Sequence, residues 1–241
     1  MLFLYFSQKV PVTIYYETLC ADSMAFFTKQ FEPTWRQLNN YIDLELVPFG
    51  KSSYTPLNNP GAFPQIPGAV VSSKNWTCHH GPNECMGNRF QSCLIDPSTN
   101  ANLDAKITLI NCLMQKATKE TPYDCNLEKP TGMEIASLVA CAHTQKGEDL
   151  FEANGRKTAL LQPPLTSVPT VVFNRSFNKA DSDAAGHIYV LKFVGVSCVL
   201  SMMKIHASVR QRSGGRFYVS SFRILFFLLG LNPWDNLFHG R

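Results

Sequence analysis

Eight cysteines in 241 residues constrain this chain more than any other feature of its sequence. That number is high for a cytosolic protein of this length and low for a small scaffold held together by disulfides alone. Apolar residues make up 45% of the chain and charged residues 17%, which excludes a disordered or coiled-coil protein. The sequence therefore predicts a secreted or lumenal globular protein with a hydrophobic core and a few disulfides.

The positive charge is concentrated at one end of the chain. Residues 187–241 contain seven Lys/Arg and one acid, and removing them from the totals of 22 and 18 leaves 15 basic and 17 acidic residues in 1–186. A main body with a net charge of −2 does not favour nucleic acid as a partner, because that would need a basic folded surface. We expect 186–241 to be an atypical basic tail, an alternative end of the chain; a membrane-surface or heparin-binding tail is the competing hypothesis.

Targeting signals favour passage through the secretory pathway. Residues 1–6 are apolar but lack a charged start, so 1–8 are interpreted as the remnant of a signal peptide or the start of a first strand. Two glycosylation sequons begin at Asn75 and Asn174. No run reaches the roughly 18 uncharged apolar residues that cross a bilayer, so no transmembrane span is predicted. The expected location is secreted or lysosomal.

The first 50 residues are typical of a strand–helix–strand unit. Residues 10–16 are rich in β-branched and aromatic side chains, and 41–47 alternate apolar and polar. Between them apolar residues recur every three or four positions, at Met24, Phe27, Phe31, Trp35 and Leu38. Pro33 lies inside this helical stripe and predicts a kink.

The remainder predicts a helical insertion followed by a last strand. Residues 50–100 are rich in proline and predict loops. Helices are expected near 107–117, after a capping-box pattern at Thr131–Glu134, and over 150–161 with an interruption at Gly155. A strand is expected at 168–173, with a turn near Arg175. Asp181 or Ser182 is the candidate N-cap of a final helix.

The chemistry is expected where the first strand passes to the first helix, at Cys20. A cysteine at a helix start lies near unpaired backbone N–H groups and the positive end of the helix dipole, which both favour the thiolate. In a C-x-x-C motif the first cysteine attacks a disulfide and the second resolves the product. Here Ser23 occupies the second position; its hydroxyl can donate a hydrogen bond but cannot form a disulfide. Asp22 should oppose formation of the Cys20 thiolate somewhat. Pro169 begins the later strand, and the peptide bond before it is either an ordinary trans bond or a cis bond.

The segment Cys78-His-His-Gly-Pro-Asn-Glu-Cys85-Met-Gly-Asn-Arg-Phe-Gln-Ser-Cys93 resembles the signature of the gamma-interferon-inducible lysosomal thiol reductase family, C-Q-H-G-x2-E-C-x2-N-x4-C. Seven fixed positions match, and His79 replaces the Gln. The resemblance extends from about residue 9 to 185. It implies an α/β fold, a thioredoxin-like βαβ…ββα sandwich with a disulfide-stapled helical insertion at about 51–165. It also implies that Cys20 is the nucleophile, that Ser23 stands at the resolving position, and that Pro169 is the cis-proline.

Two interpretations of the cysteine-rich segment remain. Zinc could be bound by Cys78, His79, His80, Cys85 and Cys93, but spacings of six and seven residues between the cysteines do not favour it, so no metal is predicted. Three structural disulfides are favoured, in any of 15 pairings, among Cys78, Cys85, Cys93, Cys112, Cys125 and Cys141. His80 and Glu84 are either catalytic helpers or satisfied structural residues of a tight loop.

The resemblance implies a thiol–disulfide oxidoreductase acting on disulfides of other proteins. Because Ser23 cannot resolve a mixed disulfide, monothiol exchange is expected, with no bound cofactor and with an external thiol such as glutathione or cysteine as reductant. The alternative is a catalytically silent secreted glycoprotein of the same fold that acts as a binding or immune-interaction protein.

Overall fold

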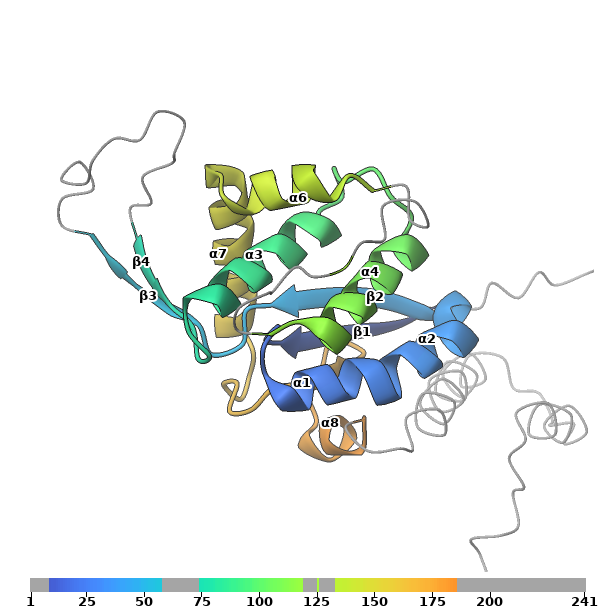
Figure 1. Cartoon of the computed structure of the whole chain (residues 1–241). Helices are drawn as coiled ribbons and strands as arrows, with labels where there is room; N and C mark the ends of the chain where they lie inside the picture. The colour runs from blue at the N-terminus through green and yellow to red at the C-terminus, as the bar shows by residue number, and fades with distance from the viewer. Residues whose placement is uncertain (1–8, 58–73, 119–124, 126–132, 186–241) are drawn as a thin grey trace, which may run out of the picture. The chain divides into compact units, whose positions relative to one another are not determined.

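A three-stranded sheet forms the centre of the computed structural model, which describes residues 9–57, 74–118, 125 and 133–185 (Figure 1). Strand β1 (Val10–Tyr16) pairs in parallel with β2 (Ile42–Pro48) and antiparallel with β5 (Thr170–Phe173), in the order β2-β1-β5. The three predicted strands are thus confirmed. The proposed signal remnant at 1–8, the tail at 186–241 and Cys198 lie outside the described residues.

The parallel pair is connected by a helix that changes its winding before Pro33. Helix α1 (Ala21–Phe26) leads into one π-helical turn, η1 (Phe27–Phe31), then α2 (Glu32–Leu38) and a short 3₁₀ turn, η2 (Asn39–Tyr41). Pro33 is the second residue of α2, which follows the π turn directly, so the helix departs from regular α winding where the proline cannot donate a backbone hydrogen bond. The expected irregularity therefore takes the form of a π turn that precedes the proline.

Each face of the sheet is covered by apolar side chains. On one face the ring of Tyr16 lies 4.6 Å from that of Phe27 in η1. On the other, Tyr15, Val47 and Val172 pack with Leu161. This strand–helix–strand unit with an added antiparallel strand is a thioredoxin-like α/β fold.

The insertion between β2 and β5 is built from a hairpin and four helices within the described residues. The hairpin pairs β3 (Ser53–Pro56) with β4 (Lys74–Thr77). The helices are α3 (Pro82–Ile95), α4 (Leu103–Lys116), α6 (Ile135–Ala142) and α7 (Gln145–Ala159), and α8 (Lys179–Ala185) follows β5. Among the helices of this described part, none is both long and apolar enough to cross a membrane.

Within the part of the chain that the structure describes, three disulfides cross-link the insertion. They join Cys78 to Cys85, Cys93 to Cys141 and Cys112 to Cys125, which selects one of the 15 pairings left open by the sequence. The second bond connects α3 to α6, and the first closes the loop from the end of β4 into α3. Because Cys78, Cys85 and Cys93 are all oxidised, they are not thiolate ligands for zinc.

The prediction of loops throughout 50–100 was wrong, because α3 occupies 14 residues of that segment. Its buried face carries polar side chains at Glu84, Asn88, Gln91 and Ser92. Each of these makes hydrogen bonds, for example Asn154 Nδ2 to Ser92 Oγ at 3.0 Å. A helix that buries a polar face lacks the apolar periodicity by which helices are recognised in a sequence.

Helix boundaries account for the other differences from the sequence expectation. Helix α6 begins after Glu134, which is its N-cap and not its third residue, and Thr131 lies outside the described residues. Helix α8 begins at Lys179, and the Oδ1 of Asn178 accepts from the N–H of Asp181, so Asn178 performs the capping expected of Asp181 or Ser182.

Helix α7 continues through Gly155 where an interruption was expected. The glycine allows close packing: a Cβ at this position would lie 2.7 Å from the ring of Phe49. Phe49 belongs to a buried cluster with Phe151 and the Cys78–Cys85 disulfide. Close approach of two elements, and not a break in the helix, explains this glycine.

Gly155→Ala is expected to destabilise the protein although alanine is the better helix former. The new methyl group would overlap the Phe49 ring, and overpacking of this kind costs about 1–3 kcal/mol of unfolding free energy. Urea unfolding measures the change. The double variant with Phe49→Leu should show a smaller penalty relative to Phe49→Leu alone; a full penalty in that background would contradict the proposed overlap.

Candidate active site

Cys20 lies at the junction of β1 and α1. It is the N-cap residue of α1, in extended conformation, and its side chain makes no capping hydrogen bond. It is 9% exposed, and its Sγ lies 3.8 Å from the carbonyl oxygen of Val168. Among the cysteines of the described residues, Cys20 is the one with a free thiol. A free sulfur therefore lies at a helix start, next to the backbone that leads into β5.

Ser23 is fully buried in the first turn of α1. Its Oγ accepts a hydrogen bond from the backbone N–H of Glu17 at 3.4 Å. Within the described part of the chain, this is the hydrogen bond found for the Ser23 side chain, and the donation to the Cys20 thiol considered from the sequence is not seen. Ser23 therefore ties α1 to the segment that precedes Cys20.

Pro169 follows Val168 through a cis peptide bond, one of the two outcomes considered from the sequence. The Val168 carbonyl that approaches Cys20 belongs to this bond. Thr170 Oγ1 donates to the Ser167 carbonyl at 2.7 Å and fixes the turn into β5. Tertiary structure thus brings Pro169 to the Cys20 side of the sheet across about 150 residues of sequence.

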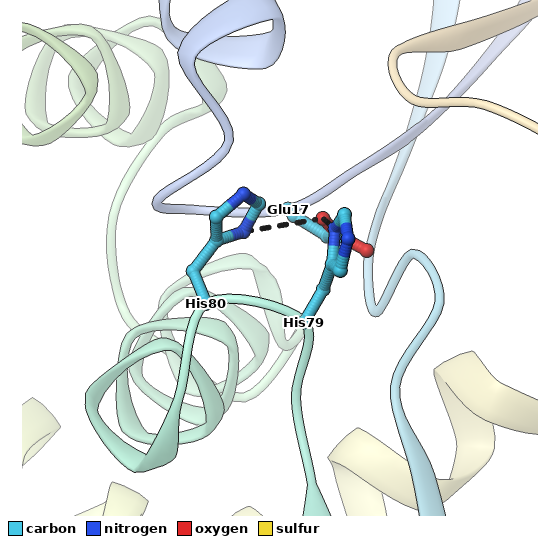
Figure 2. A group of neighbouring side chains, drawn as sticks. All are labelled: Glu17, His79 and His80. Carbon is cyan, nitrogen blue, oxygen red and sulfur yellow. Dashed lines mark hydrogen bonds and ion pairs between the residues drawn. The ribbon is translucent and has the colours of Figure 1, made fainter.

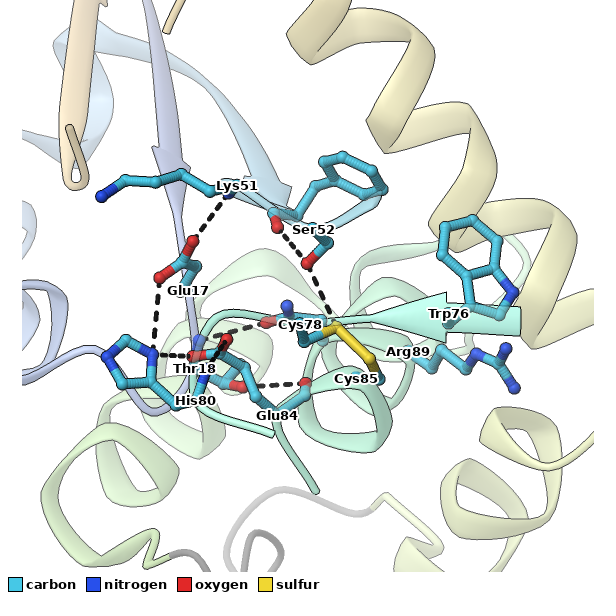
Figure 3. The surroundings of a disulfide bond; sticks show 12 residues. Glu17, Thr18, Lys51, Ser52, Trp76, Cys78, His80, Glu84, Cys85 and Arg89 are labelled. Carbon is cyan, nitrogen blue, oxygen red and sulfur yellow. Dashed lines mark hydrogen bonds and ion pairs between the residues drawn. A yellow bond between two sulfur atoms is a disulfide. The ribbon is translucent and has the colours of Figure 1, made fainter. Parts of the chain in front are cut away.

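The carboxylate of Glu84 is a centre of hydrogen bonding next to His80 and Thr18 (Figure 3). Glu84 is fully buried at the start of α3. Its Oε2 accepts from the N–H of Leu19 at 3.3 Å and contacts His80 Nδ1 at 2.6 Å, and its Oε1 accepts from the N–H of His80 at 3.0 Å. A carboxylate removed from water needs such donors. Glu84 thereby holds the residue immediately before Cys20.

The rest of the cysteine-rich signature holds the same segment. The N–H of Thr18 donates to Asn88 Oδ1 at 3.0 Å, and the Tyr16 hydroxyl donates to Gln91 Oε1 at 2.6 Å. Burial raises the pKa of Tyr16, which keeps this hydroxyl protonated as a donor. The segment 16–19 is thus bonded to Glu84, Asn88 and Gln91 of α3, which together position the turn that carries Cys20.

Glu17 is the second fully buried carboxylate of the site. Its Oε1 accepts from the N–H of Lys51 at 2.7 Å, while its Oε2 lies 3.3 Å from His79 Nδ1 and 3.5 Å from His80 Nδ1. Gly50 packs directly on Glu17, with a φ of +57° and no room for a Cβ. No local pattern in the sequence indicates this pairing, because Glu17 and His79 are 62 residues apart.

The Cys78–Cys85 disulfide fixes the loop that carries both histidines. The Ser52 hydroxyl lies 3.2 Å from Cys78 Sγ and donates to the Phe49 carbonyl at 2.6 Å. Figure 3 shows the disulfide on the side of α3 next to Trp76 and Arg89. A loop closed covalently at both ends keeps His79 and His80 over the Cys20 segment.

Glu84→Gln is expected to lower the unfolding free energy by about 1–3 kcal/mol, because the new NH₂ group cannot accept any of the N–H donors around it. Chemical unfolding measures the loss. Glu45→Gln is the matched control, since Glu45 is 48% exposed and pairs with Lys157 at the surface; its effect should stay within about 1 kcal/mol. Equal losses in the two variants would contradict the anchoring role of Glu84.

Comparison with known proteins assigns a family to this chain. Residues 11–129 match the family described as "Gamma interferon inducible lysosomal thiol reductase (GILT)". The chain is 35% identical to "GILT-like protein 1" of Drosophila melanogaster, over 80% of this chain and 76% of that protein. It is 27% identical to "Gamma-interferon-inducible lysosomal thiol reductase" of Mus musculus, over 73% of this chain and 65% of the mouse protein. Among solved structures, Chlamydia trachomatis DsbA aligns with a TM-score of 0.47 and 12% identity, over 74% of this chain and 86% of DsbA. The chain belongs to the gamma-interferon-inducible lysosomal thiol reductase family.

Proposed function

We propose that this protein exchanges disulfides of other proteins through Cys20 by a monothiol mechanism. The observation that carries the proposal is the placement of a free cysteine at the start of α1, beside the Val168 carbonyl. Membership of a thiol reductase family supports the reaction class. Cys20, Ser23 and Pro169 are the residues to which the site is assigned.

The first step is attack of the Cys20 thiolate on one sulfur of a substrate disulfide. A new bond forms between Cys20 Sγ and that sulfur, the substrate S–S bond breaks, and the second substrate sulfur leaves as a thiolate. The 9% exposure of Cys20 restricts the approach to a substrate strand that reaches the surface near Val168. Protein disulfides in extended segments are therefore the proposed substrates.

The second step needs a thiol that α1 does not supply. Ser23 cannot attack the mixed disulfide, so release depends on glutathione, free cysteine or another cysteine of the substrate. With two external thiols, the first displaces the substrate from Cys20 and the second removes the first as a small-molecule disulfide, leaving the substrate reduced by two electrons. With a substrate cysteine as the attacking group, the product is an isomerised substrate.

The rival function is that of a catalytically silent binding protein. The observation that favours it is the complete burial of Ser23 and its hydrogen bond to Glu17 N–H. A serine integrated in this way serves the fold whether or not Cys20 reacts. In the rival case the Cys20 thiol remains unreactive towards disulfides.

The distinguishing experiment mixes the full-length protein with a disulfide-bonded peptide in the absence of external thiol. We expect a covalent adduct at Cys20, identified by peptide mapping and released by a dithiol reductant. Ser23→Cys should not accumulate the adduct and should reduce the peptide roughly tenfold faster or more at millimolar external thiol, because an intramolecular thiol resolves it. Cys20→Ser is the control that forms no adduct at this position. Absence of an adduct in the natural protein, with no reductase activity in Ser23→Cys, would favour the binding protein.

A secreted or lysosomal location is the second part of the proposal. The sequon asparagines Asn75, on β4, and Asn174, in the turn after β5, are both exposed, and the three disulfides fit an oxidising compartment.

Expression through a eukaryotic secretory pathway should therefore yield two N-glycans. Enzymatic removal of N-glycans should shift the protein on a gel in the same way as Asn75→Gln combined with Asn174→Gln. Each single substitution should remove one step of the shift. Identical mobility of the natural protein and the double variant would contradict glycosylation.

A further inference from the structure

We propose that Glu17, His79 and His80 form a binding site for a divalent transition metal of the zinc class. Figure 2 shows the imidazole rings of His79 and His80 next to the Glu17 carboxylate. Within the described residues, one potential ligand atom from each side chain lies within 4.8 Å of the other two. The chemistry of two imidazoles and a carboxylate is that of open zinc sites with three protein ligands.

Two distances between the candidate ligand atoms match the edges of a zinc coordination tetrahedron. In a tetrahedral zinc site with bonds of about 2.0–2.2 Å, neighbouring ligand atoms are about 3.3–3.6 Å apart. Glu17 Oε2 lies 3.3 Å from His79 Nδ1 and 3.5 Å from His80 Nδ1. Both nitrogens therefore lie at the distance of a tetrahedral edge from the same oxygen, and His80 Nδ1 must give up its contact with Glu84 for a metal ion to reach all three atoms.

The surroundings orient the carboxylate and leave an entry path. The other oxygen of Glu17 is held by the Lys51 N–H, and Gly50 packs against its side chain. Contacts of this kind fix ligands in metal sites. The His79 side chain is 51% exposed and that of His80 27%, while Glu17 is fully buried. The site is therefore open to solvent on the histidine side.

Binding exchanges hydrogen bonds for metal bonds. Glu84 Oε2 contacts the same His80 Nδ1 at 2.6 Å, so that nitrogen is a hydrogen-bond donor to a carboxylate before metal binds. A neutral imidazole that binds the ion through Nδ1 carries its proton on Nε2. Because Glu84 Oε2 is already next to His80 Nδ1, Glu84 or a water molecule is the candidate for a fourth ligand.

The sequence pattern does not predict this site, because the candidate ligands near the two histidines along the chain are cysteines. Those cysteines form disulfides, and the third ligand comes instead from β1's end, 62 residues earlier. Metal bound here connects the segment that carries Cys20 to the loop before α3. The inference does not depend on the thiol chemistry of Cys20.

The test uses full-length protein carrying Cys20→Ser, which removes the thiol as a competing ligand. Isothermal titration with Zn²⁺ at pH 7.5 should detect one site. His79→Gln introduces the glutamine of the family signature and should weaken the Zn²⁺ affinity of this site at least about tenfold. His143→Gln is the matched control, because His143 is exposed and outside the cluster; its affinity should stay within about twofold of the parent. Cys198 and the histidines other than His79 and His143 are present in the parent and in both variants. Any Zn²⁺ that they bind therefore contributes equally to the three titrations.

A second readout uses Co²⁺, whose visible absorption distinguishes tetrahedral from octahedral coordination. A tetrahedral spectrum in the parent that is lost in His79→Gln supports the site, as does loss in Glu17→Gln where that buried variant folds. Equal Zn²⁺ affinity of parent and His79→Gln, equal weakening by His79→Gln and His143→Gln, or no binding in the parent would each overturn the assignment.

Discussion

The buried carboxylate of Glu84 is the group on which the arrangement of the site depends. It cannot be solvated, so it must be matched by donors from within the fold. It accepts hydrogen bonds from the backbone N–H of Leu19, from the backbone N–H of His80 and from His80 Nδ1. Satisfying one charge therefore fixes the residue before Cys20 against the start of α3. The disulfide from Cys78 to Cys85 then holds that start in place.

The residues that stabilise the fold of this protein also set the geometry of its site. The segment 16–19 is held by polar side chains of α3 and is not held by apolar packing alone. Hydrogen bonds have directions, so they place a backbone turn more narrowly than apolar contacts do. The same design explains why an insertion far from β1 in sequence belongs to the site. The disulfides of the insertion stabilise α3, whose side chains position the turn that carries Cys20.

Attack and resolution are separable in a site of this kind. The position of Cys20 depends on the β1–α1 junction and on the approach of Val168, and neither requires a cysteine at position 23. Ser23 retains a structural task through its bond to Glu17 N–H. The fold can therefore keep the geometry around Cys20 without a cysteine at position 23.

The sequence alone determined the βαβ unit, the last strand, the six disulfide cysteines and the position of Cys20, because apolar periodicity and local motifs record these features. It did not determine α3, whose buried face is polar, nor the reason for Gly155, which is the ring of Phe49. Only the tertiary structure decided the disulfide pairing and the meeting of Glu17 with His79 and His80. Those contacts join residues that are far apart along the chain. A local sequence pattern reflects only residues that are close in sequence, so it does not predict which distant side chains the fold brings together.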